Sequence, residues 1–251
     1  PTRNTMGILE LTILAGALAG GFVSGLTGFG TGLTALAVWL TVIEPAVAAP
    51  LVVICSLISQ FFTLPAIWHA ISWPRVLPFI VGGVVGVPLG TMILPMVSVE
   101  GFKLFFAVFL VLYCGFTLAQ RAAPKLAWGG KLANAIVGLG GGVLGGLTGL
   151  SGPLPTIWAT LRGWSKDEKR GVFQGYNTAI LLLAVVTQAI GGFMTLEVGR
   201  VALIAFPATV VGSWIGRKIY GRLGDSSFNQ VVLALLMFSG LSMIVAIVWP
   251  S

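Results

Sequence analysis

Charged residues are scarce in this sequence of 251 residues. Asp, Glu, Lys and Arg together make up 8% of the chain, whereas hydrophobic residues make up 57%. A soluble domain carries roughly 25% charged residues, so this chain has too few of them to cover a water-facing surface. The low charge therefore excludes the ordinary soluble classes and predicts a polytopic membrane protein, most of whose surface faces lipid.

The residue types that build metal centres and catalytic sites are also few. Cys55 and Cys114 lie inside apolar runs, and they are typical of small core residues rather than of a disulfide or a metal pair. His69 is the single histidine, which argues against a histidine-based triad or metal cluster. The net charge of +7 has no dense basic face behind it, so it indicates cytoplasmic loops rather than nucleic-acid binding. We expect no catalytic residue, no metal, no cofactor and no nucleic-acid partner, and we expect the lipid bilayer as the environment.

Glycine, in contrast, is abundant, and two glycine-rich stretches repeat one pattern. The stretch "GGFVSGLTGFGTGLTAL" begins at Gly20, and "GGVLGGLTGLSGPLPT" begins at Gly141. Shorter matches follow in the same order: "SQ" at 59–60 with "TQ" at 187–188, and "VVGVPLG" at 84–90 with "VVGSWIG" at 210–216. Because their order is kept, the matches predict a duplicated unit, with 1–124 as the first repeat and 125–251 as the second.

Apolar runs of about 20 residues, the length needed to cross a bilayer, predict a series of full spans. They are 45–66, 75–94, 101–119, 171–192, 201–219 and 227–249. The two remaining units, 7–43 and 132–161, contain the glycine stretches. Each divides into a long leg and a shorter one, 33–43 in the first unit and 153–161 in the second.

The basic residues decide the expected topology. If each glycine unit is a hairpin that returns to its starting side, most Lys and Arg collect on one side of the membrane. They are Arg75, Arg121, Lys125, Lys131, Arg162, Lys166, Lys169, Arg170, Arg217, Lys218 and Arg222. That side is expected to be cytoplasmic. Three spans then follow each hairpin, so the second repeat is inverted and both termini are extracytoplasmic. A lopsided unit, whose long leg nearly spans the bilayer alone, stays open as the alternative.

The sequence thus predicts an all-α polytopic membrane protein with two inverted repeats, each a broken or re-entrant helical hairpin plus three transmembrane helices. Matching glycine- and proline-interrupted segments in inverted repeats are typical of alternating-access transporters with a midplane binding site. The residues after each break begin a new helix, whose free N–H groups favour an anion.

The polar residues of the spans indicate the charge of the ligand. Those at deep positions are neutral, and no Asp or Glu lies near the centre of a span, which argues against a cation carrier or a carboxylate proton relay. No Lys or Arg is expected deep in a span either, and 162–171 is interpreted as a solvated loop. We therefore predict a small anion, bound by helix ends together with hydroxyl and amide donors.

Three other interpretations stay open. The glycines can serve close helix packing alone, as small residues spaced by four do in membranes. An anion channel would share the repeats but would need a continuous polar path. A membrane scaffold that transports nothing would need no polar residues at the midplane.

The quoted stretches resemble a known family. "GGFVSGLTGFGTG", "GGVLGGLTGLSGP" and the later "GYNT" at 175–178 are similar to motifs of the TauE/SafE family, also called the toluene sulfonate uptake permease family. The resemblance covers nearly the whole chain. It implies a secondary transporter of the bacterial inner membrane for sulfur-containing anions such as sulfite, sulfoacetate and other organosulfonates. Gly30 is replaced by Ser151 in the second stretch, so the expected site is only pseudo-symmetric.

The expected substrate-binding residues come from the two breaks and from side-chain donors near them. They are Ser24, Thr27, Gly28, Phe29, Gly30, Thr31, Gln60, Thr148, Gly149, Leu150, Ser151, Gly152, Asn177 and Gln188. Phe29 and Leu150 hold equivalent positions and would wall the carbon end of the ligand. A homodimer is left open as the assembly.

Overall fold

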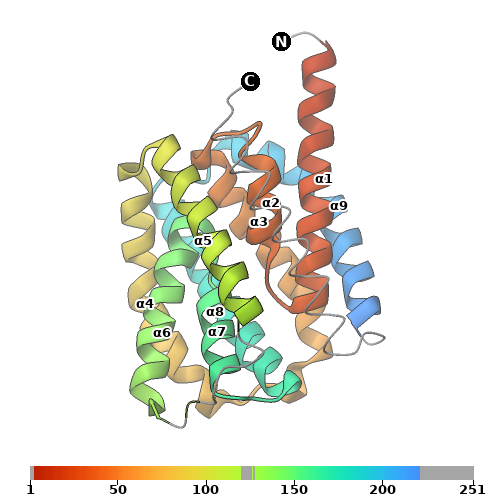
Figure 1. Cartoon of the computed structure of the whole chain (residues 1–251). Coiled ribbons are helices and arrows are strands. Elements are labelled where there is room, and N and C mark those ends of the chain that lie inside the picture. The colour runs from red at the N-terminus through yellow and green to blue at the C-terminus, as the bar shows by residue number, and fades with distance from the viewer. Residues whose placement is uncertain (1–2, 120–125, 127, 221–251) are drawn as a thin grey trace.

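The structure is a computed structural model that describes residues 3–119, 126 and 128–220 (Figure 1). The described residues form helices and no strand, which confirms the all-α class. The α-helices are α1 (Arg3–Thr27), α2 (Thr31–Trp39), α3 (Pro45–Thr63), α4 (Trp73–Ile93), α5 (Val99–Ala119), α6 (Gly130–Thr148), α7 (Pro153–Leu161), α8 (Lys166–Ile190) and α9 (Leu196–Tyr220). Short 3-10 turns, η1 (Leu64–Ala66), η2 (Trp68–Ala70) and η3 (Leu94–Met96), follow α3 and α4.

Five helices in the described part of the chain are long and apolar enough to cross a membrane. They are Gly7–Thr27, Pro45–Thr63, Trp73–Met96, Glu168–Ile190 and Leu196–Tyr220. The predicted spans 45–66, 75–94, 101–119, 171–192 and 201–219 correspond to α3, α4, α5, α8 and α9. The predicted span 227–249 lies outside the described residues.

The two glycine units are broken where the sequence predicts, and each doubles back on itself. Trp39 at the end of α2 donates from Nε1 to the carbonyl oxygen of Ile13 in α1, at 3.1 Å. Just before the second unit, the Leu126 amide donates to the carbonyl oxygen of Leu161, the last residue of α7, at 2.8 Å. Both units are lopsided, because α1 has 25 residues and α6 has 19, whereas α2 and α7 have nine each.

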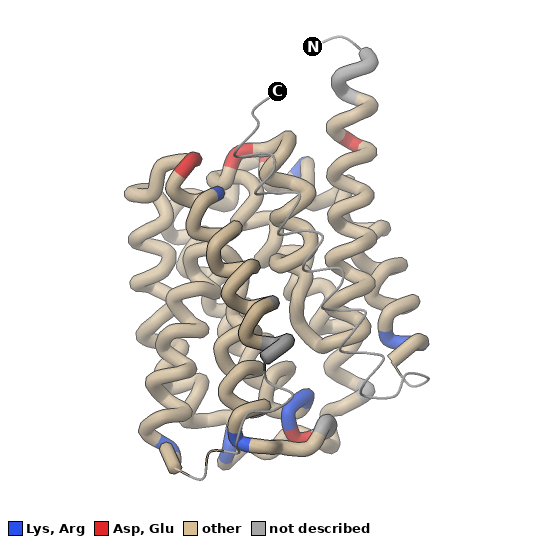
Figure 2. The backbone as a smooth tube through the Cα atoms, in the orientation of Figure 1, with Lys and Arg blue, Asp and Glu red and all other residues tan. Residues whose placement is uncertain are grey.

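Charge is separated along the length of the helix bundle (Figure 2). The acidic segments gather mainly at the end where α1 begins, with Glu44 just before α3 and Glu197 in the first turn of α9. Most basic segments lie at the opposite end, among them Arg217 and Lys218 in the last turn of α9. The two ends therefore differ in electrostatic potential.

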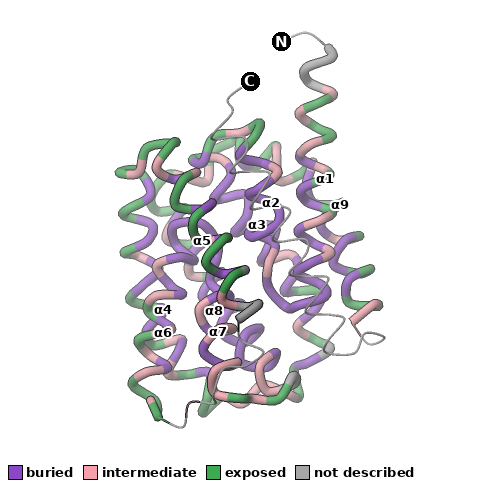
Figure 3. Tube along the Cα trace, in the orientation of Figure 1, coloured by how far each residue is buried: buried purple, intermediate pink, exposed green. Residues whose placement is uncertain are grey.

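The sides of the bundle expose large apolar side chains. Val81 of α4 is 64% exposed, Leu112 of α5 is 66% exposed, and Leu203 of α9 is 77% exposed. Figure 3 shows exposed residues along most of α5, whereas the middle of the bundle is buried. A soluble monomer rarely carries apolar patches of such extent, so these faces suit lipid.

Helices α1 and α9 pack backbone against backbone through glycine. A Cβ added at Gly25 would lie 2.2 Å from the carbonyl oxygen of Ser213. In return, a Cβ added at Gly216 would lie 2.1 Å from the carbonyl oxygen of Phe22. Van der Waals contact between carbon atoms begins at about 3.5 Å, so any larger residue would push these helices apart.

Helices α4 and α6 pack in the same way, and the contacts correspond. A Cβ added at Gly146 would lie 2.2 Å from the carbonyl oxygen of Val87, and one at Gly90 would lie 2.1 Å from that of Val143. The sequence matches pair Gly146 with Gly25, and Val87 with Ser213. Each half of the chain therefore supplies one helix to each glycine-mediated pair.

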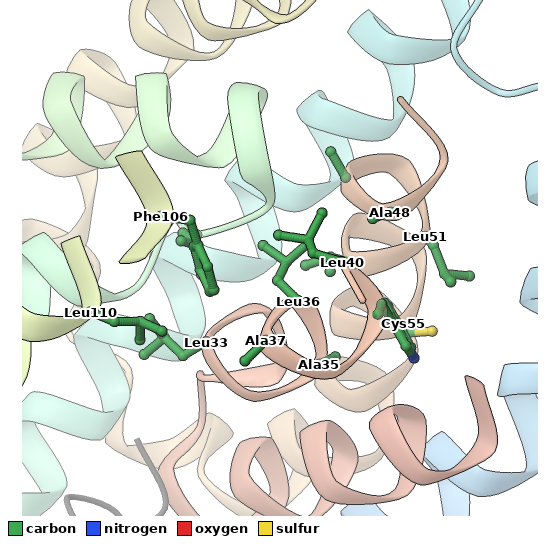
Figure 4. Packing of buried hydrophobic residues seen from close by; sticks show 14 of the residues in the cluster. Leu33, Ala35, Leu36, Ala37, Leu40, Ala48, Leu51, Cys55, Phe106 and Leu110 are labelled. Carbon is green, nitrogen blue, oxygen red and sulfur yellow. The ribbon is translucent and has the colours of Figure 1, made fainter. Parts of the chain in front are cut away.

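The short helix α2 lies inside the main apolar cluster. Leu33 and Leu36 are fully buried, and Figure 4 shows them near α5 on one side, with α3 on the other. The partner side chains in this cluster include Phe106 and Leu110 of α5 and Ala48, Leu51 and Cys55 of α3. This packing fixes where α2 begins, and so fixes the geometry of the first break.

Candidate functional site

The first break is made by glycines in a conformation that other residues avoid. Helix α1 ends at Thr27, and Gly28 and Gly30 have φ angles of 83° and 103°. The left-handed region costs a residue with a Cβ about 1–2 kcal/mol, whereas glycine enters it freely. The Thr27 hydroxyl donates to the Val23 carbonyl at 2.9 Å and accepts from the Phe29 amide at 3.1 Å. Thr27 therefore holds the turn together.

The second break has the same design with one glycine fewer in the left-handed region. Gly149 has a φ of 74°, and its amide donates to the Gly145 carbonyl at 2.9 Å, which closes the end of α6. The Thr148 hydroxyl donates to the Leu144 carbonyl at 2.8 Å. Pro153 opens α7, where its missing N–H is harmless.

The two breaks lie against each other. A Cβ added at Gly32, at the start of α2, would lie 2.6 Å from Leu150 Cδ2 of the second break. A Cβ added at Gly152, just before α7, would lie 2.7 Å from the Phe29 Cβ of the first. The apolar residue of each break thus covers the start of the opposite short helix. The first N–H groups of a helix lack partners within it. The start of α2 therefore offers the amides of Thr31, Gly32 and Leu33, whereas α7 offers only that of Leu154 among its first three residues, because Pro153 and Pro155 have no N–H.

A cavity lies where the breaks meet. Its lining residues are Ser24, Phe29, Gly30, Thr31, Gly32, Ser56, Gln60, Gly149, Leu150, Ser151, Gly152, Pro153, Asn177 and Leu181. The space open to the centre of a water molecule is about 10 Å³, which is room for about one water. None of these lining residues is charged, so the cavity offers hydroxyl, amide and backbone groups only.

Two hydroxyls in the cavity wall are buried without a partner. Ser24 and Thr31 are each 1% exposed, and neither side-chain oxygen has a hydrogen-bond partner within the described part of the chain. Leaving a buried hydroxyl unpaired costs about 1–3 kcal/mol. The neighbouring Ser151 hydroxyl, in contrast, donates to Asn177 Oδ1 at 2.8 Å. The unpartnered hydroxyls of Ser24 and Thr31 indicate a place where a ligand would complete the hydrogen bonding.

Comparison with known proteins identifies the family to which this chain belongs. The family model described as "Sulfite exporter TauE/SafE" matches residues 12–243. The chain belongs to the TauE/SafE family. Members of this family are transporters, so the chain is a multi-pass membrane transporter and not an enzyme.

A relative with a curated name supports the same family. "Probable sulfite/organosulfonate exporter TauE" from Cupriavidus necator is 26% identical over 247 residues. The alignment covers 94% of this chain and 93% of that relative, so the two proteins match over nearly their whole lengths. No solved structure matches the chain.

In this TauE/SafE protein, most of the expected site residues line the cavity, but four do not. Thr27 and Thr148 each donate to the carbonyl four residues earlier in their own helix. Gly28 does not line the cavity, and its carbonyl accepts from Gln60 Nε2 at 2.8 Å. Gln188 Nε2 donates to the Gly146 carbonyl at 3.0 Å. These four residues do not line the cavity, and each takes part in a hydrogen bond with a side chain or backbone carbonyl near the breaks.

Some residues at the site were missing from the sequence-based set. Gly32, Ser56, Pro153 and Leu181 line the cavity as well. Leu181 lies one helical turn after Asn177 on the same face of α8, and helical spacing from Asn177 would have found it. Ser56 lies one turn before Gln60 in α3 and could have been found in the same way.

The interpretation of 162–171 as a solvated loop was wrong for Arg170. Arg170 was placed in a solvated loop over 162–171, but it belongs to α8, and it is only 4% exposed. Ser165 caps this helix, accepting from the Glu168 amide at 3.3 Å, so helical geometry starts before Arg170. Arg170 Nε donates to Gln174 Oε1 at 3.2 Å. Helical spacing could have indicated that Arg170 faces the bundle, because Arg170, Gln174 and Asn177 share one face of α8.

Proposed function

We propose that this protein is a secondary transporter that moves a small sulfur-containing anion, such as sulfite or an organosulfonate, across the bacterial inner membrane by alternating access. The observation that carries the proposal is the uncharged cavity between the two helix restarts, with the unpaired hydroxyls of Ser24 and Thr31 in its wall. A cation would find no carboxylate there, whereas an anion would find N–H and hydroxyl donors.

The name of the Cupriavidus necator relative supports sulfite and organosulfonates as the substrate class. Sulfite and sulfonate groups carry several oxygens that share the negative charge. Such a group can accept hydrogen bonds from both breaks at once. Phe29 and Leu150 would then face the carbon part of an organosulfonate. The cavity has room for about one water, so substrate binding requires the walls to separate.

We further propose that the two halves, 1–124 and 125–251, are inverted repeats. The corresponding glycine contacts of α1 with α9 and of α4 with α6 support this proposal. The basic end of the bundle would face the cytoplasm, in keeping with the positive-inside rule. The N-terminus would then be extracytoplasmic. The expected position of the C-terminus falls outside the described residues, and nothing supports a homodimer.

Counterflow in proteoliposomes tests the proposed function. Vesicles are loaded with unlabelled sulfite, and the uptake of labelled sulfite or sulfoacetate is followed, with acetate and sodium as matched control solutes. A carrier gives saturable uptake that rises with the internal concentration of the unlabelled anion. Flux without such exchange would indicate a channel, and no flux of any sulfur-containing anion would favour a scaffold and refute the proposal.

A further inference from the structure

Arg170 is a buried cation at the basic end of the bundle, one turn inside α8. Its Nη2 donates to the Gly25 carbonyl of α1 at 3.2 Å, and its guanidinium lies 3.6 Å from the ring centroid of Tyr220. Removing a charge from water costs several kcal/mol, which only good bonding geometry offsets. The presence of an arginine at this position therefore needs an explanation.

A chain of amide side chains connects Arg170 to the cavity. Arg170 Nε donates to Gln174 Oε1, and Gln174 Nε2 donates to Gln60 Oε1, both at 3.2 Å. Gln174 Nε2 also donates to Thr63 Oγ1 at 2.6 Å. Gln60, which lines the cavity, donates from Nε2 to the Gly28 carbonyl. Gln174 is fully buried and Gln60 is 1% exposed, so water does not compete for these bonds.

The chain has a direction, which Arg170 sets at one end and the Gly28 carbonyl at the other. A guanidinium group has donors and no acceptor, so Gln174 must turn its oxygen toward Arg170. The NH₂ group of Gln174 then faces Gln60, so Gln60 must turn its own oxygen toward Gln174 to accept the hydrogen bond. As a result, the NH₂ group of Gln60 points to the side of the first break. The Gly28 carbonyl, which can only accept, favours the same orientation of Gln60 from the other end of the chain.

We propose that Arg170 is a positioning residue that makes the cavity selective for anions, because it acts through Gln174 to present the NH₂ group of Gln60 as a donor. This inference rests on the proposed function of anion transport. With the amides reversed, Gln60 would present a carbonyl oxygen, and the cavity wall would repel an anion. The hydrogen bonds of a buried chain of this kind also polarise one another, so the arginine strengthens the terminal donor.

A purely structural role for Arg170 makes a different prediction. The Gly25 carbonyl lies near the C-terminal end of α1, where a positive charge is favourable. If Arg170 served only to hold that helix end, its loss would lower thermal stability and leave anion affinity unchanged. Affinity and stability must therefore be measured separately.

Gln174→Glu is the sharpest variant. It keeps the shape of the side chain and still accepts from Arg170, but it can no longer donate to Gln60. The Gln60 amide should turn its NH₂ group toward the new carboxylate and its oxygen toward the cavity. We expect sulfite to bind about 10- to 100-fold more weakly, the loss of a hydrogen bond to a charged group. The turned amide also loses its bond to the Gly28 carbonyl, so the unfolding temperature without substrate is measured alongside and should fall as well.

Two variants of the arginine and one control complete the experiment. Arg170→Met should weaken sulfite binding by a similar factor, and Arg170→Lys, which again only donates, should restore it. The matched control is Arg217→Met, because Arg217 also donates to a helix-end carbonyl, that of Phe62 at 3.0 Å, and is exposed. The control should bind sulfite as the wild type does.

Binding is measured by titration calorimetry of sulfite into the purified full-length protein, alongside thermal unfolding without sulfite. If the wild type binds sulfite and both Gln174→Glu and Arg170→Met keep its affinity, the inference is overturned and the proposed function stands. If the wild type binds no sulfur-containing anion, both are overturned. Weak binding in both variants, with Arg170→Lys restored, supports the inference.

Discussion

Replacing Thr31 by valine should change ligand binding and stability in opposite directions. The substitution keeps the branched shape and removes only the hydroxyl, whose oxygen is buried without a partner in the described residues. An unpaired buried hydroxyl costs about 1–3 kcal/mol. The variant without substrate should therefore be as stable as the wild type, or more stable by up to that amount.

The affinity for the anion should fall in the same variant. If the Thr31 hydroxyl donates to the anion, its loss removes a hydrogen bond to a charged group, worth about 1.5–3 kcal/mol. That corresponds to a dissociation constant raised about 10- to 100-fold. Thermal unfolding in detergent measures the first effect, and titration with sulfite measures the second.

Thr148→Val is the matched control for this experiment. The Thr148 hydroxyl donates to the Leu144 carbonyl of its own helix and does not line the cavity. Valine there should leave sulfite affinity within about threefold of the wild type, since no ligand bond is removed. Equal affinity in Thr31→Val and the wild type would refute the assignment of this hydroxyl to the ligand. Equal loss in both threonine variants would show that the change to valine weakens binding without removal of a ligand bond, and would also refute the assignment.

Three further experiments, with five substitutions, test the charge, the packing and the orientation of the protein. Asn177→Asp keeps the acceptor for the Ser151 hydroxyl and adds a negative charge, so proteoliposome uptake of sulfite should fall to background. The variant should still elute as the wild type does in gel filtration. Undiminished uptake would show that the anion does not lie near Asn177. Gly146→Ala should prevent a stable fold, because its Cβ would lie 2.2 Å from a carbonyl oxygen. Gly199→Ala has open space around it and should raise the free energy of unfolding by about 0.5–1 kcal/mol. Equal unfolding temperatures of the two variants would contradict the packing. Ser165→Cys should react with an impermeant maleimide only after cell lysis, and Thr41→Cys, near the opposite end, should react in intact cells; the reverse pattern would invert the topology.

The breaks could be predicted from the sequence because their cause is local. Left-handed glycines and a proline at a helix start act within a few residues, so the pattern around Gly30 and Gly149 carries its own geometry. The meeting of the two breaks followed from their matching positions in the chain. Most lining residues were therefore found without any knowledge of the packing.

What the sequence could not indicate depends on distant contacts and on helix ends. Thr148 and Gln188 are polar and deep, but only the packed structure shows that their side chains bond to backbone carbonyls of α6. Arg170 follows a run of charged residues, and composition alone places such a run in water. The cap at Ser165 starts α8 early, and this carries Arg170 into the buried part of the bundle.

The glycine contacts between α1 and α9 have a consequence for biosynthesis. A ribosome delivers the chain from its N-terminus, so α1 enters the membrane long before α9 exists. Until then, the glycine face around Gly25 has no backbone to pack against, and lipid or an insertase must cover it. The α4–α6 pair needs much less of the chain and can close first. Of the two glycine-mediated pairs, the one between α1 and α9 can therefore close only after α9 has been made.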